Sequence, residues 1–109
     1  MNRPADRTVL ALDEAEAEIQ SRWFVWTAAG LKVDPVTWTD HDAGPRSLGL
    51  RVSRPNAHAD IVLYADGWTD VAVRRPGADA VTPESAQLES VDAFGRLLDR
   101  VIELITWSG

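Results

Sequence analysis

The sequence of 109 residues contains no cysteine, and this absence excludes disulfide bonds, thiolate metal sites and cysteine nucleophiles together. Histidine is also scarce. Only His41 and His58 are present, and neither stands at metal-ligand spacing or within a nucleophile motif, so we expect both to be exposed in turns. The seven glycines form no phosphate-binding pattern. We therefore expect a protein without a cofactor or a bound metal ion.

A long hydrophobic run is missing as well. The longest apolar stretch, residues 23–31, is about half of the ~20 residues that cross a bilayer. Acidic residues between positions 13 and 18 stand where the apolar part of a signal peptide would be. We therefore expect a cytoplasmic protein that does not enter a membrane.

Basic residues are outnumbered, 11 against 17 acidic ones, which gives a formal net charge of -6. Nucleic acids and anionic membranes attract basic surfaces, so this balance argues against both as partners. With 45% apolar residues, the chain has enough apolar surface to bury in a folded core. Its length suits one core, so we expect a single domain over residues 1–109, with residues 1–7 as a flexible N-terminus.

The sequence predicts a helix near each end of the chain. Apolar residues recur at helical spacing between positions 8 and 29, and Gly30 is typical of a helix terminator. Ser90 is the candidate cap of a final helix. The apolar stripe of that helix comprises Val91, Phe94, Leu97, Leu98, Val101, Leu104 and Ile105.

Between the helices the apolar period changes to two, which is typical of strands. We expect strands at residues 33–39, 48–53, 61–65 and 68–75, with turns at 40–46 and 54–58. Asp66-Gly67 is a hairpin signal because glycine accepts a positive φ. Residues 80–89 fit a helix or an edge strand, and we favour the strand. The sequence thus predicts an α+β fold, in which an antiparallel meander of four to five strands carries both helices.

Five tryptophans exceed what a small core needs. Helical spacing assigns Trp23 and Trp26 to the core, and strand alternation favours the core for Trp38. Trp107 is expected to fold back onto the base of the last helix. Trp68 follows the hairpin turn, where core packing and contact with a partner are equally compatible with its position.

A set of polar side chains is predicted on one face of this hairpin: Asp60, Tyr64, Asp66, Asp70 and Arg74. The solvated side of a half-buried antiparallel sheet would have the same composition. An acidic patch with an amphipathic tyrosine would also suit recognition of another molecule. These five residues and Trp68 form the candidate partner-binding site.

Residues 59–71 read ADIVLYADGWTDV, which is a strand with an aromatic residue, a short turn with glycine, and an aspartate before an apolar residue. This pattern resembles the immunity proteins of bacterial polymorphic toxin systems, most specifically the group called TriTu. Tyr64, Gly67 and Asp70 take the corresponding places, and Tyr64 stands where that group commonly has tryptophan. The flanking order of a tryptophan-bearing first helix, a strand and a capped last helix is similar too.

The resemblance implies a non-enzymatic immunity protein that binds and occludes a cognate toxin domain in the producer's cytoplasm, as a monomer or a homodimer. A toxin that acts on nucleic acid is often basic, and a net charge of -6 would steer the encounter. In this hypothesis Trp68 and Tyr64 anchor the contact, while Asp60, Asp66 and Asp70 pair with basic groups.

Two hypotheses from other classes stay open. A secretion-chaperone-like dimer would hold an extended segment of cargo protein at an exposed edge strand. A small enzyme would need a carboxylate, such as Asp66 or Asp70, whose pKa is raised by burial in a pocket.

Overall fold

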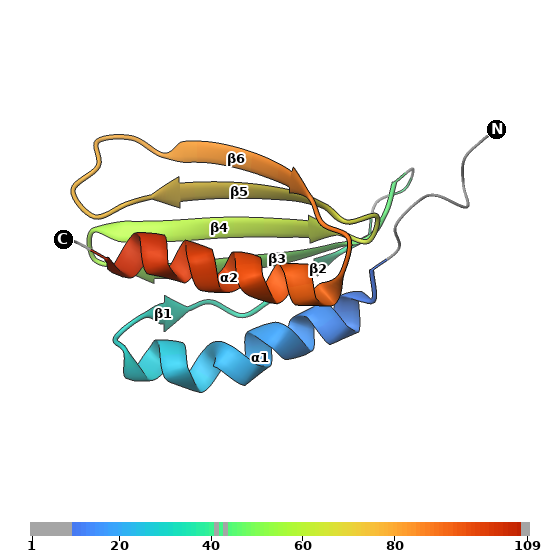
Figure 1. Ribbon diagram of the computed structural model, residues 1–109, viewed down its shortest axis with the longest axis horizontal. Helices are drawn as coiled ribbons and strands as arrows, with labels where there is room; N and C mark the ends of the chain where they lie inside the picture. Colours follow the sequence, from blue (N-terminus) through green and yellow to red (C-terminus); the bar gives the residue numbers. More distant parts are fainter. Residues whose placement is uncertain (1–9, 41, 43, 108–109) are drawn as a thin grey trace.

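The computed structural model describes residues 10–40, 42 and 44–107, and residues 1–7 and His41 lie outside this part of the chain. An antiparallel sheet carries an N-terminal and a C-terminal helix, so the predicted α+β fold is confirmed (Figure 1). No helix in the described ranges has the length and apolarity to span a membrane. The elements are α1 (Leu12–Ala28), β1 (Lys32–Val33), β2 (Thr37–Thr39), β3 (Ser47–Arg54), β4 (Ala57–Tyr64), β5 (Trp68–Arg74), β6 (Thr82–Gln87) and α2 (Val91–Thr106).

The sheet is a meander with one broken edge. Its order is β1-β3-β4-β5-β6. Strand β2 lies on the same edge as β1 and pairs with the first residues of β3, whereas β1 pairs with residues near its end. The strand expected at residues 33–39 is therefore two short strands, separated by residues 34–36, because Pro35 has no N–H to donate to a ladder. At the other edge, residues 82–87 form β6, so the favoured prediction of an edge strand in this segment is confirmed and the helical alternative is wrong.

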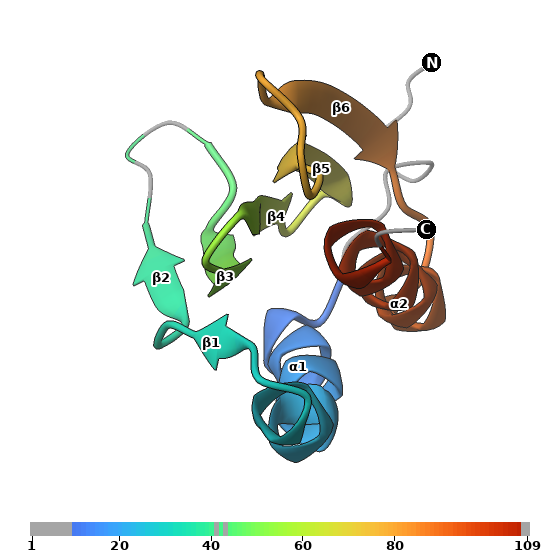
Figure 2. The same cartoon turned by 90° about the vertical axis from the view of Figure 1, so that its left-hand side faces the viewer.

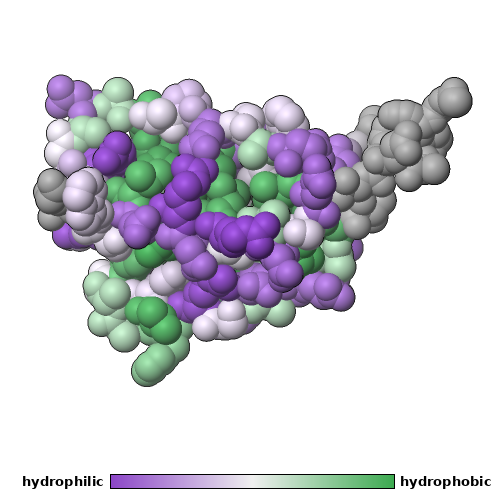
Figure 3. All heavy atoms as spheres, in the orientation of Figure 1, coloured by the Kyte–Doolittle hydropathy of each residue, from purple (hydrophilic) through white to green (hydrophobic). Residues whose placement is uncertain are grey.

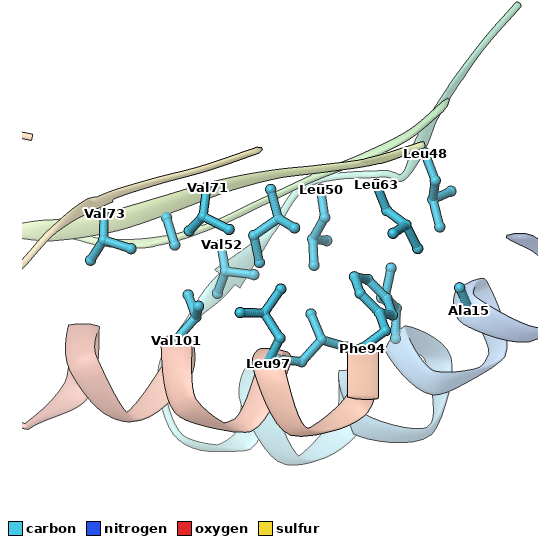
Figure 4. Packing of buried hydrophobic residues seen from close by; sticks show 14 of the residues in the cluster. Ala15, Leu48, Leu50, Val52, Leu63, Val71, Val73, Phe94, Leu97 and Val101 are labelled. Atoms are coloured by element: carbon cyan, nitrogen blue, oxygen red, sulfur yellow. The ribbon is translucent and has the colours of Figure 1, made fainter. Parts of the chain in front are cut away.

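Both helices cover the same face of the sheet (Figure 2). Alternate residues of β4 and β5 are buried on that face, as period-two patterning requires. Figure 4 shows side chains of β3, β4 and β5 packed against α2, with Ala15 of α1 beside them. The fully buried side chains include Phe94, Ile19, Leu48, Ile61, Leu63, Leu98 and Ile105. On the opposite face of the sheet, the described residues form no helix.

Both predicted helix termini are confirmed. Gly30 has a φ of +90°, and the N–H of Leu31 donates to the carbonyl oxygen of Trp26 at 3.0 Å, which closes the end of α1. At the start of α2, the hydroxyl of Ser90 accepts a hydrogen bond from the N–H of Ala93 at 3.0 Å.

An ion-pair network joins the two helices. The guanidinium of Arg22 donates from Nε to Asp99 Oδ1 at 2.7 Å and from Nη1 to Glu18 Oε1 at 2.8 Å. Gly95 leaves room for this network, since a Cβ there would lie 2.9 Å from Glu18 Oε1. The hydrogen bond from Arg22 holds the pKa of Asp99 below its usual value of 3.8.

The lowered pKa of Asp99 predicts a pH-dependent contribution to stability. A carboxylate whose folded pKa is depressed stabilises the protein above its unfolded pKa and loses this effect as pH falls through the folded pKa. Because Asp99 is 63% exposed, we expect Asp99→Asn to reduce the free energy of unfolding by only about 0.5–1 kcal/mol at pH 7. The difference from wild type should shrink below about pH 4 in urea unfolding. Asp79→Asn in the exposed β5–β6 loop is the control, and a pH-independent deficit for Asp99→Asn would contradict the prediction.

Candidate functional site

We call the side of the sheet that neither α1 nor α2 covers the open face. It consists of the residues that alternate with the buried ones in β3, β4 and β5, together with their cross-strand partners in β2 and β6. In Figure 2 this face lies to the upper left of β3, β4 and β5, opposite α1 and α2. Five of the six candidate residues lie on it: Asp60, Tyr64, Trp68, Asp70 and Arg74. The structure thus brings most of the predicted set onto one surface.

Asp66 is the exception, because it lies in the β4–β5 turn and not on the open face. Its Oδ1 accepts a hydrogen bond from the N–H of Trp68 at 3.0 Å, and its carbonyl oxygen accepts one from Gln87 Nε2 at 2.7 Å. These contacts hold the turn in place. The expectation that Asp66 shares a face with Asp70 is therefore wrong, because the turn interrupts the alternation between the two strands.

Trp68 is 43% exposed, so the structure places it at the surface and not in the core. Its indole Nε1–H donates to Asp70 Oδ1 at 3.2 Å. The same carboxylate oxygen accepts a hydrogen bond from the hydroxyl of Ser85 at 2.9 Å. This chain of contacts spans β5 and β6 and fixes the orientation of a large aromatic side chain.

The centre of the open face holds a second polar group. Arg51 Nη1 lies 3.0 Å from Asp60 Oδ1 and 2.9 Å from Asp60 Oδ2, and the two residues face each other across β3 and β4. His58 Nε2 lies 3.9 Å from Asp60 Oδ2. The prediction that His58 lies in a turn is wrong, because the Pro55-Asn56 turn is shorter than expected and β4 already begins at Ala57.

A shallow depression of about 230 Å³ lies beside this group, next to the break in the sheet edge. Pro35 and Thr37 line it on the side of the broken edge, and Gly49 of β3 lines it as well. Asp34 and Asp60 are also among the residues that line it. The carboxylate of Asp34 has a lysine nitrogen, Lys32 Nζ, at 3.9 Å.

The remaining candidate residue, Arg74, lies at the far end of β5. Its Nε donates to the carbonyl oxygen of Ala78 at 3.1 Å, so it also closes the loop that follows. Trp107 is 61% exposed, its backbone N–H donates to the carbonyl oxygen of Glu103 at 2.9 Å, and it lines a hollow together with Glu103 and Leu104 at the end of α2. Trp38 points toward the core, half-buried, with the Arg46 guanidinium 4.9 Å from its ring centroid.

Sequence reasoning missed several residues of the open face. Arg51 and Ser85 each bind a predicted aspartate, and strand alternation alone would have placed both on the correct face. The register that puts them opposite Asp60 and Asp70 is set by turn lengths that the sequence did not settle. The depression at Gly49 has no sequence signal except a glycine inside a strand.

Charge is unevenly distributed over the molecule. Both helices start at one end, on the right in Figure 1, where the β2–β3 loop and the β4–β5 turn also lie. We call this the acidic end, and its described carboxylates are Asp13, Glu14, Asp40, Asp42, Asp66, Glu89 and Asp92. Some of them complement the helix dipoles. Elsewhere, Phe24 and Val25 are exposed, and Figure 3 shows hydrophobic side chains protruding from the C-terminal half of α1 at the lower left.

The described residues contain no group of three metal-ligating side chains close enough to share an ion. No protein-family model matches the chain, and neither the curated proteins nor the solved structures contain a match to it.

The hairpin that carries Trp68 depends on Gly67. We expect Gly67→Ala to lower the free energy of unfolding by more than about 2 kcal/mol, because φ is +91° and the new Cβ would overlap the carbonyl oxygen of Leu88. Gly30→Ala is the matched control, with φ at +90° but open space around its Cβ, and should cost only about 1 kcal/mol. Urea unfolding measures both, and equal losses would show that the close approach to Leu88 contributes nothing.

Proposed function

We propose that this protein is a non-enzymatic immunity protein that binds a basic toxin domain of the same cell through the open face and occludes its active cleft. The observation that carries the proposal is the uncovered sheet face with its half-exposed, oriented tryptophan. The resemblance of residues 59–71 to TriTu immunity proteins supports the choice of a toxin as the partner.

The arrangement around Trp68 favours protein binding. Aromatic side chains surrounded by polar groups are typical of binding hot spots. The indole is already held by Asp70, so little side-chain freedom would be lost on association. Asp60 and Asp70 lie on the same face and can accept hydrogen bonds from basic groups of a partner.

The charge distribution supports a basic partner. Tyr64 and Trp68 flank the β4–β5 turn, which belongs to the acidic end, so that end adjoins the open face. Carboxylates at the rim of an interface raise the association rate with a positively charged surface. The net charge of -6 acts in the same direction at longer range.

The edge strand is a weaker candidate for a binding surface than the open face. The N–H of Leu88 points toward β5, where it donates to the carbonyl oxygen of Gly67 at 2.8 Å. Amide directions alternate along a strand, so Pro83, five residues before Leu88, is one of the positions where an N–H would point outward. Proline has no N–H to donate there. The ladder that an added cargo strand would need is therefore interrupted at Pro83. This argues against the chaperone hypothesis in its edge-strand form.

Affinity capture of the tagged protein from its own cytoplasm tests the proposal. The expected result is one large protein whose C-terminal domain stops growth when expressed alone and is tolerated when this chain is co-expressed. Recovery of an unfolded export substrate, or of no protein, would contradict the proposal.

Trp68→Ala should weaken the complex with the captured domain by at least ~2 kcal/mol, or about thirtyfold in Kd, because it removes the oriented anchor. Its effect on the free energy of unfolding should stay below about 1 kcal/mol, since the side chain is exposed. Trp107→Ala is the control, because it removes an exposed tryptophan outside the open face. Titration calorimetry gives both affinities. If the two variants bind the domain with the same Kd, Trp68 is not an anchor of the complex.

The association rate should fall on the order of tenfold as salt rises from 0.01 to 1 M, because salt screens exposed charges. Asp42→Lys, at the acidic end, should reduce this salt dependence. Asp79→Lys makes the same charge change at the opposite end and should reduce it less. Stopped-flow mixing with the captured domain measures the rates. A salt-insensitive rate, or equal effects of the two variants, would exclude steering by the acidic end.

A further inference from the structure

Gly49 stands inside β3 for no reason that the fold supplies. Its φ is outside the left-handed region, so the backbone does not require glycine there. A Cβ at this position would meet only Thr37, with the Cβ and the carbonyl oxygen of that residue both at 3.7 Å, which is ordinary van der Waals contact. Glycine in a strand interior costs about 0.5–1 kcal/mol relative to alanine. Gly49 does line the depression on the open face, where a side chain would occupy part of that space.

The walls of the depression come from three strands and the break between β1 and β2. Pro35, Thr37 and Val62 are among the residues that line it. The volume of about 230 Å³ is that of a subsite for a side chain and too small for a typical small-molecule pocket. A depression of this kind on an interaction face fits one protruding side chain of a partner.

The charges of the residues that line the depression favour a basic side chain of a partner. Asp60 is neutralised by Arg51, which contacts both of its carboxylate oxygens. The Asp34 carboxylate is 39% exposed, and its lysine contact, Lys32 Nζ at 3.9 Å, is at the limit of an ion pair and 80% exposed. Such a surface pair contributes little, so Asp34 retains most of its capacity to bind a cation. Taken together, the lining residues Asp34, Arg51 and Asp60 carry one net negative charge.

We infer that the depression beside Gly49 is a binding site for one basic side chain of the partner protein, with its apolar stem over Gly49 and its cationic head at Asp34. The inference rests on the proposed function for the identity of the partner. The ligand chemistry itself, a guanidinium or ammonium group on an aliphatic stem, rests on the depression alone.

A small probe tests the site without the toxin. N-acetyl-arginine amide is titrated into the labelled protein and followed by amide chemical shifts, with N-acetyl-citrulline amide as the uncharged isostere. We expect shifts at Thr37, Gly49 and Asp60 with a Kd on the order of 10 mM for arginine, and a much weaker response to citrulline. Equal responses to both probes, or shifts confined to other surfaces, would overturn the inference.

Variants connect the site to the partner. Gly49→Ala and the larger Gly49→Val fill part of the depression, and Asp34→Asn removes the charge; each should weaken arginine binding at least threefold. Gly49→Ala stays informative where valine disturbs β3, because its Cβ meets only ordinary contacts. Trp107→Ala, outside the open face, should leave arginine binding unchanged.

The same variants measured against the captured toxin domain separate the two proposals. We expect Gly49→Val and Asp34→Asn to raise the Kd of the complex about tenfold. If Trp68→Ala raises the Kd of the complex but Gly49→Val and Asp34→Asn do not, the inference of a basic-side-chain site is wrong and the proposed function stands. If arginine binds and no toxin is captured, the site stands and the proposed function is wrong.

Discussion

One-sided burial of the sheet is the constraint on which the rest of this structure depends. Both helices lie on one face, and alternate residues of β4 and β5 supply its apolar side chains. Full burial of a leucine, valine or isoleucine side chain is worth about 1.5–3 kcal/mol, so the period-two pattern fixes which residues face the helices. The same pattern forces the intervening residues outward. The open face therefore follows from the core, and its composition is free to serve another purpose.

The parts of the fold that were predictable are those set by local chemistry. Ser90 caps α2 and Gly30 ends α1 because hydrogen bonding and φ decide these positions within a few residues. The break between β1 and β2, the early start of β4 at Ala57 and the exposure of Trp107 depend on turn geometry and on the packing of the rest of the chain. Local patterns carry little information about such features.

The candidate site divides in the same way. Alternation placed Asp60, Tyr64 and Asp70 on one face correctly, but it failed at Asp66, where the chain leaves the strand. Alternation could have placed Arg51 and Ser85 on this face, but only the cross-strand register shows that each lies opposite an aspartate. A surface that binds a partner is assembled from several strands, so its members are recognisable singly in the sequence and as a group only in the fold.

The two edges of the sheet bear on how this chain behaves when it is concentrated. Unpaired strand edges template intermolecular pairing, which leads to aggregation, and natural sheets interrupt them with proline, charge or breaks. Here Pro83 interrupts one edge and the break at Pro35 divides the other into segments of two and three residues. Neither edge presents a long, flat ladder to a second molecule. Edge-to-edge pairing with a second molecule is therefore disfavoured, although the described part of the chain places no helix on one face of the sheet.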